Sequence, residues 1–170
     1  MATQIPVGTL GVVPHHVLGR LTVDVKKVRR SYDGCPEIDV FDGQIKATVQ
    51  ADGTAVRINL TPEFAGDDLG DDLASWVDRC ADRILRAIAD LDAIKAHVAE
   101  DEETKVPWLT DGEAPLTKPE FIGRLTLCGI NFLDDEFMKL FFNDGGLFFG
   151  HSIIVDIEKD GKPGQVQLFG

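Results

Sequence analysis

His151 is the residue whose surroundings most suggest chemistry. It follows Gly150 directly, inside the apolar segment GLFFGHSIIVDI at 146–157. A buried strand explains the apolar residues but not an imidazole, which can act as a general base, a metal ligand or a proton switch. Asp144 could orient the ring, and a small-molecule or hydrolytic site would be lined by Trp108, Tyr32, Phe149 and Gly150. The alternative is a half-buried histidine that bonds to the backbone or to Asp144 and has no catalytic role.

A second pair of histidines lies near the start of the sequence. His15 and His16 are adjacent, and neither a cysteine nor a carboxylate stands at a recognised ligand spacing from them. A zinc site built on this pair would have to recruit His151 or Asp24 through the fold. We therefore predict that the protein binds no metal.

Other motifs with known chemistry are incomplete. The segment 156–167 has part of the spacing of a calcium loop, but its twelfth position is Gln167 rather than a bidentate glutamate, so a hairpin turn is expected there. The glycine-containing segment 66–73 is acidic, which is the wrong charge for binding phosphate. No cofactor is expected. The cysteines show no CxxC spacing and are expected to be reduced, mostly buried thiols of a cytoplasmic protein; they are Cys35, Cys80 and Cys128.

The net charge of −12 is concentrated in the middle of the chain, where residues 61–117 hold 15 acidic and 5 basic side chains. Such a surface repels nucleic acid and anionic lipid, and it attracts a basic partner at low salt. The sequence also lacks an apolar run of the length that spans a membrane. We expect a protein partner, and we expect it to contact the acidic residues Asp67, Asp68, Asp71, Asp72, Glu100, Asp101, Glu102 and Glu103.

Two helices are predicted. Apolar residues recur at three- and four-residue spacing from Asp68 to about Glu100, which indicates one long amphipathic helix. Thr117 begins a short second helix, because Pro119 falls in the first turn and Glu120 stands three residues after the cap.

Short runs rich in β-branched and aromatic residues lie on both sides of the helices, and Asp-Gly pairs at 33–34, 42–43, 52–53 and 160–161 mark turns between them. The run LGRLTV at 18–23 is similar to IGRLTL at 122–127, and a similar order of strands follows each, with Gln44 matching His151. We predict an α+β fold with two similar antiparallel β-meanders from an internal duplication. The single domain 1–170 would comprise a first meander (18–60), the long helix (68–100), and the short helix with the second meander (118–170).

The C-terminal half resembles a bacterial family known as a domain of unknown function. The resemblance rests on Trp108, Phe121, the LTL strand and the segment NDGGLFFGHSIIV at 143–155. It implies a tryptophan before a small helix, an acidic turn at Asp144, an aromatic pair and a Gly-His step. Such small acidic domains are similar in character to immunity proteins of bacterial toxin systems, and the resemblance assigns no reaction to His151.

Three functions are compatible with these features. The first is a protein-binding module, such as an immunity-type inhibitor, that presents its acidic surface to a cationic partner. The second is a small-molecule or hydrolytic site around His151. The third is a structural subunit that forms a homodimer or larger homo-oligomer, because the chain has more phenylalanines than one sheet face can hide, including Phe132, Phe137, Phe141 and Phe142.

Overall fold

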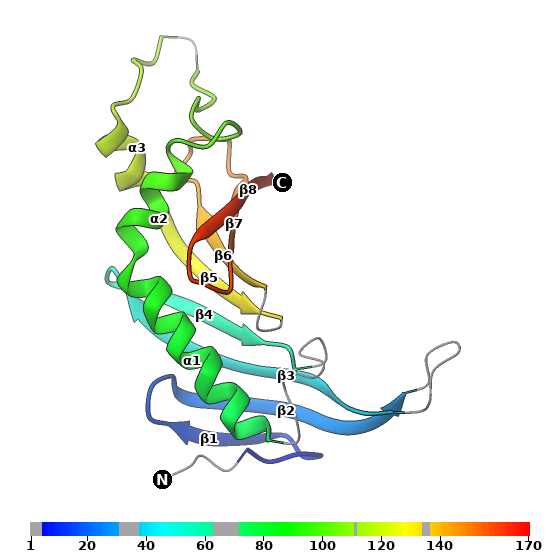
Figure 1. Ribbon diagram of the computed structural model, residues 1–170. Coiled ribbons are helices and arrows are strands. Elements are labelled where there is room, and N and C mark those ends of the chain that lie inside the picture. Colours follow the sequence, from blue (N-terminus) through cyan, green and yellow to red (C-terminus); the bar gives the residue numbers. More distant parts are fainter. Residues whose placement is uncertain (1–4, 31–37, 63–71, 111, 134–136) are drawn as a thin grey trace.

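The computed structural model describes residues 5–30, 38–62, 72–110, 112–133 and 137–170. It has an α+β fold in which one eight-stranded sheet packs against helices (Figure 1). The elements in chain order are β1 (Gly11–His15), β2 (Gly19–Arg30), β3 (Ile38–Ala51), β4 (Thr54–Leu60), α1 (Leu73–Ala89), α2 (Leu91–Val98), α3 (Lys118–Arg124), β5 (Thr126–Phe132), β6 (Met138–Asn143), β7 (Ser152–Ile157) and β8 (Pro163–Phe169).

The strands lie in the sheet in the order in which they occur in the chain. All neighbouring pairs are antiparallel except β4 and β5, which are parallel and are connected through the three helices. Gln44 lies in β3 and His151 immediately precedes β7, each the third strand of its half. The shared GRLT sequence, however, begins β2 in the first half and leads into β5 in the second. The repeat therefore does not fall at equivalent strands, and the internal duplication stays a prediction.

Asp-Gly pairs form two of the expected turns. Asp52 and Gly53 have φ values of 49° and 72°, as in the two-residue turns that suit β-hairpins, and Asp160-Gly161 lies in the β7–β8 connection. The turn predicted at Asp42-Gly43 is wrong, because both residues lie inside β3. A Cβ atom on Gly43 would stand 1.9 Å from the carbonyl oxygen of Asp24 on β2, so glycine is needed there for close strand approach. Asp33-Gly34 lies outside the described residues.

The long helix predicted from Asp68 to Glu100 is instead two helices. Asp72 is the N-cap of α1, and its carboxylate accepts hydrogen bonds from the backbone amides of Ala74 and Ser75. Asp90, with φ −95° and ψ 13°, separates α1 from α2. The apolar spacing continues across this break, so both helices bury the same stripe against the sheet. The short helix α3 begins as predicted, with a capping box between Thr117 and Glu120.

The helices α1 and α2 cross one face of the sheet (Figure 1). The core lies between these helices and the sheet. There the Trp76 ring contacts Phe132 edge to face, with 6.1 Å between ring centroids. Strand residues that alternate with the core residues point to the opposite face, which we call the open face because no described helix covers it. None of the described helices has the length and apolar character of a membrane-spanning helix.

Candidate functional site

The connection between β6 and β7, residues 144–151, forms a loop that we call the aromatic loop. Asp144 at its start is buried, and one carboxylate oxygen accepts hydrogen bonds from the backbone amides of Phe148 (2.6 Å) and Gly150 (3.1 Å). The other oxygen accepts from the amide of Gly146 at 3.1 Å. A buried carboxylate is tolerated when several donors satisfy it, so Asp144 fixes the backbone of this loop.

Backbone conformation within the aromatic loop is unusual. Phe149 has φ +55°, in the left-handed region that residues with a Cβ atom seldom adopt. Gly145 also has a positive φ, and a Cβ atom there would lie 2.5 Å from the carbonyl oxygen of Arg124. The loop therefore needs a glycine at 145 and holds an aromatic residue in a strained conformation at 149.

The two neighbouring phenylalanines of the loop have opposite environments. Phe148 is fully buried and packs edge to face against Trp108 and Phe121, at centroid distances of 5.7 Å and 6.2 Å. Phe149 is 63% exposed and Trp108 is 43% exposed, with their rings 6.1 Å apart and tilted by 42°. The fold thus presents two large rings side by side on the surface, supported from below by a buried third ring.

His151 lies at the end of this loop, beside Trp108, with 5.1 Å between ring centroids. Its Nδ1 is 2.6 Å from the carbonyl oxygen of Phe148. Because a carbonyl only accepts, Nδ1 carries a proton, and in the neutral ring Nε2 then carries the lone pair. Gly170 packs against the same ring.

The predicted pairing of Asp144 with His151 is not formed. Asp144 bonds to backbone amides and His151 to a backbone carbonyl, which agrees with the alternative of a histidine bonded to the backbone. The rings of Trp108, Phe149 and His151 lie together beside Gly150, and the pocket predicted from these residues stays a prediction. Tyr32 lies outside the described residues.

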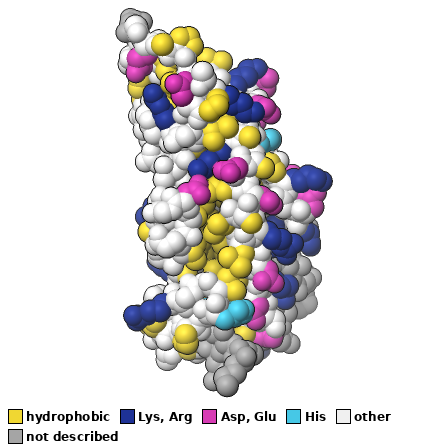
Figure 2. Space-filling view, turned by 90° about the vertical axis from the view of Figure 1, so that its left-hand side faces the viewer, with side chains coloured by type: hydrophobic (Ala, Val, Ile, Leu, Met, Phe, Trp, Pro, Cys, Tyr) yellow, Lys and Arg dark blue, Asp and Glu magenta, His cyan; other side chains and the backbone are white. Residues whose placement is uncertain are grey.

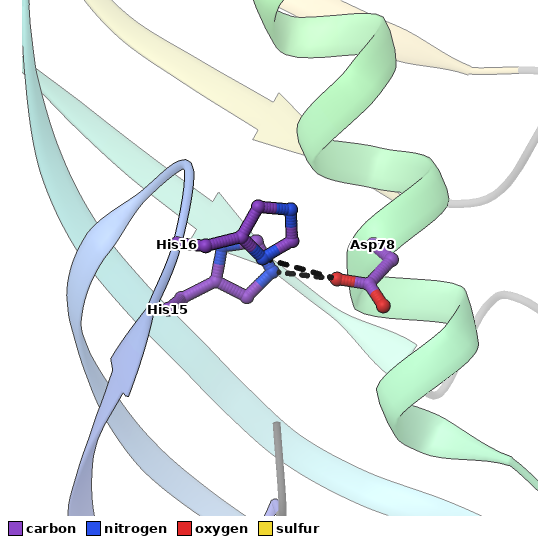
Figure 3. Close-up of side chains that lie close together, drawn as sticks. All are labelled: His15, His16 and Asp78. Carbon is purple, nitrogen blue, oxygen red and sulfur yellow. Dashed lines mark hydrogen bonds and ion pairs between the residues drawn. The ribbon is translucent and has the colours of Figure 1, made fainter. Parts of the chain in front are cut away.

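His15 and His16 meet a carboxylate that sequence reasoning missed. Figure 3 shows both rings, from the end of β1 and the turn after it, directed at Asp78 on α1. His15 Nε2 is 3.0 Å and His16 Nδ1 is 3.9 Å from the same oxygen of Asp78, and the two rings stack. Asp24 and His151, the further ligands that a zinc site was predicted to need, are not part of this cluster among the described residues.

The hydrogen bonds of His15 fix its role. Its Nδ1 accepts from the backbone amides of Val17 and Leu18, both at 3.1 Å, so Nδ1 is unprotonated and Nε2 donates to Asp78. A metal on Nε2 would require the lone pair there and the proton on Nδ1, which the two amides oppose. The cluster therefore attaches the β1–β2 hairpin to α1 and does not suit a metal ion.

Of the five described acids of the predicted acidic surface, four are engaged within the protein, with Asp72 as the cap of α1. Glu100 pairs with Lys118 and Glu102 with Lys105, while Asp101 accepts from the amide of Glu103. The hydrogen bond from Lys118 lowers the pKa of Glu100, and hydrogen bonds from Ser75 lower the pKa of Asp72. The positions Asp67, Asp68 and Asp71 lie outside the described residues. Figure 2 shows acidic and basic side chains interspersed on one face of the molecule, with a band of hydrophobic side chains along its middle.

The comparison with known families identifies the chain. A bacterial family described as "Uncharacterized protein conserved in bacteria (DUF2262)" matches residues 15–168. The chain belongs to this family. The resemblance of the C-terminal half to a bacterial family of unknown function is thereby confirmed, and the match extends through the first half as well. No curated protein and no solved structure matches the chain significantly.

The DUF2262 chain has a further feature that sequence reasoning missed. A groove of about 620 Å³ crosses the open face, lined by side chains from β3, β4, β5, β6 and β7. The polar residues of the groove alternate with core residues along the strands. This alternation is visible in the sequence, but by itself it indicates only a sheet face in contact with solvent. Cys128, predicted to be a core thiol, is half-buried, lines this groove and donates to the carbonyl oxygen of Phe141 at 3.1 Å. Cys80 is buried as expected.

Proposed function

We propose that this DUF2262 protein is a cytoplasmic protein-binding module of the immunity type, and that the exposed rings of Trp108 and Phe149 form the centre of its partner-binding surface. The observation that carries the proposal is Phe149, an aromatic residue 63% exposed at φ +55°. Exposed aromatic residues on a preformed support are typical of binding hot spots.

Energetics support this interpretation. A left-handed conformation costs a residue with a Cβ atom roughly 1–2 kcal/mol, and an exposed phenyl ring recovers little of this through burial. Local strain of this kind, held by surrounding structure, is typical of functional positions. Here the holding structure is Asp144, whose buried carboxylate binds three backbone amides of the loop.

A basic partner fits the charge of the chain. With a net charge of −12, the protein attracts cations over the whole molecule even though Glu100 and Glu102 are engaged in ion pairs. Lysine and arginine side chains also bind favourably over aromatic faces, so a basic segment suits both the long-range field and the two exposed rings.

The experiment is affinity capture from a lysate of the source cells at low and high salt, comparing the wild type with Trp108→Ser and Phe149→Ser. The matched control is Leu10→Ser, which removes a hydrophobic side chain that is 73% exposed at the other end of the chain. We expect one stoichiometric basic protein that the wild type and the control retain and the two variants lose. Equal recovery by all four proteins would contradict the assigned surface.

A second candidate is the small-molecule or hydrolytic site around His151. The observation in its favour is that Nδ1 donates to Phe148, which leaves the Nε2 lone pair available as a base. Replacement of His151 by glutamine should then abolish a detected activity without unfolding the domain. Activity that survives in His151→Gln would exclude the candidate.

The third candidate function is that of a homo-oligomer subunit, and the argument for it is the large number of phenylalanines. Phe132 and Phe142 are fully buried in the core, whereas Phe137 is 50% exposed and Phe141 lines the groove. Sedimentation at increasing protein concentration tests it, because a subunit that self-associates shows a rising mass and a monomer does not.

A further inference from the structure

The groove on the open face is the strongest candidate for a second, independent site. It is centred where β4 and β5 pair in parallel, and its volume of about 620 Å³ lies in the range of small-molecule sites. Lys46 and Arg57 bring positive charge to it, Asn59 and Asn131 bring amides, and Phe141 brings an apolar wall.

The charges in the groove are unusual for this chain. Neither Lys46 nor Arg57 makes an ion pair or a side-chain hydrogen bond with any described residue. An adjoining hollow of about 230 Å³ shares Lys46 and adds Arg20, which is also without such a partner in the described segments. No carboxylate lines either cavity, although the net charge of the chain is −12. Two cations left unpaired beside a groove are complementary to an anion.

Nearby carboxylates do not neutralise these cations. Asp156 on β7 is engaged with Lys139 at 2.6 Å. Asp24 is the neighbour of Gln44 across the β2–β3 pair and is not within ion-pair distance of a described cation. The positive charge therefore remains available to a bound molecule.

Asn59 places a second requirement on the chemistry of a molecule that binds in the groove. Its side-chain oxygen is shielded from solvent and has no hydrogen-bond partner among the described residues. A shielded acceptor without a partner is unfavourable, so a rotation of the Asn59 amide that turns its oxygen into the groove would be stabilised by a ligand that donates a hydrogen bond to it.

We propose that the groove binds a small organic anion, a carboxylate or phosphate with an apolar or aromatic body and a hydrogen-bond donor. Arg57 and Lys46 bind the anionic group, Phe141 packs against the apolar body, and Asn59 accepts from the donor. This site is separate from the aromatic loop, so it does not depend on the proposed protein partner.

The experiment is a titration of the full chain with 4-hydroxyphenyl phosphate, 4-hydroxybenzoate and hydroquinone, followed by calorimetry and amide NMR shifts. We expect at least one of the two anions to bind, with shifts on β3, β4 and β5, and to bind at least tenfold more tightly than uncharged hydroquinone. Preference for one anion identifies the group as phosphate or carboxylate.

Three variants locate the site. Lys46→Gln and Arg57→Gln should each weaken anion binding at least tenfold, whereas Lys105→Gln, which removes a lysine paired with Glu102, should leave it unchanged. Gly129→Leu places a side chain in the groove, and its Cβ would meet other atoms at no less than 3.7 Å; binding should be lost in a variant whose melting temperature shows that it is folded. Equal binding of hydroquinone, unchanged binding by the Lys46 and Arg57 variants, or binding of a single-stranded oligonucleotide but neither anion would overturn the proposal.

Discussion

At the scale of single residues, the adjacent pair Phe148 and Phe149 shows how one residue type serves two purposes. Phe148 fills the core beneath Trp108, and Phe149 stands in solvent in a left-handed conformation. From the sequence we predict that Trp108, Phe149 and His151 share one site. It could not show which phenylalanine is exposed, because that depends on how Asp144 folds the loop.

Substitutions of this pair should separate stability from binding. Phe149→Gly relieves the left-handed strain, so the free energy of unfolding should be unchanged or up to about 1 kcal/mol higher. Phe148→Ala removes a buried ring and should lower it by about 3–5 kcal/mol. Urea denaturation of both variants measures this. A loss for Phe149→Gly as large as that for Phe148→Ala would show that Phe149 is a core residue.

His15 is predicted to stabilise the fold and not to bind metal. His15→Ala removes the acceptor for two backbone amides and the donor to Asp78, so the free energy of unfolding should fall by about 2–4 kcal/mol. One equivalent of Zn²⁺ should leave the melting temperature of the wild type unchanged, since Nδ1 of His15 is already an acceptor. A zinc-dependent rise that is lost in Asp78→Ala would contradict this role.

At the scale of elements, the sequence was most informative where local rules decide the structure. The amphipathic stripe predicted helical structure over the region of α1 and α2, the capping box predicted the start of α3 at Thr117, and Asp52-Gly53 predicted a hairpin. The break at Asp90 was missed because the apolar spacing continues through it. The turn predicted at Asp42-Gly43 was wrong because contact with β2, and not local turn preference, requires that glycine.

Two glycines of the β3–β4 hairpin separate the effect of a local turn from that of contact between strands. Gly53→Ala places a Cβ atom in open space at φ +72°, and should cost about 1–2 kcal/mol. Gly43→Ala also forces a Cβ atom against the Asp24 carbonyl, so its cost should exceed about 3 kcal/mol. Thermal unfolding compares them. Similar melting temperatures for the two variants would show that β2 and β3 do not approach as closely at Gly43.

The cap of α1 should make stability depend on pH. Hydrogen bonds from Ser75 hold the pKa of Asp72 below its ordinary value, so this contribution is complete above about pH 4 and is lost as the pH falls through the lowered pKa. The lowered pKa values of Glu100 and Glu120 act in the same direction. Urea unfolding of the wild type and Asp72→Asn from pH 6 to pH 2.5 should show their difference shrinking on acidification. A difference that grew at low pH would contradict the role of the ionised cap.

At the scale of the whole molecule, the sheet has two different faces. One is covered by α1 and α2 (Figure 1), and the open face carries the groove, whose lysine and arginine have no ion-pair partner among the described residues. The alternating strand pattern indicates a polar face. It could not predict the groove, because five strands from both halves of the chain contribute to it and their order is set by the parallel pairing of β4 with β5.

The net charge of −12 acts at this same scale. The described acids of the predicted surface are mostly engaged as a helix cap or in ion pairs, so attraction of a basic partner would come from the field of the whole chain and weaken with added salt. Affinity would come chiefly from the exposed rings on the aromatic loop.

The most direct test of the account is the affinity of Phe149→Gly for the captured partner, measured by calorimetry beside the wild type and with the free energy of unfolding determined for both. We expect Phe149→Gly to bind at least about tenfold more weakly, as for loss of an aromatic hot spot, with a free energy of unfolding equal to or above that of the wild type. Unchanged affinity in a fully folded Phe149→Gly protein would contradict the proposal that the aromatic loop binds the partner.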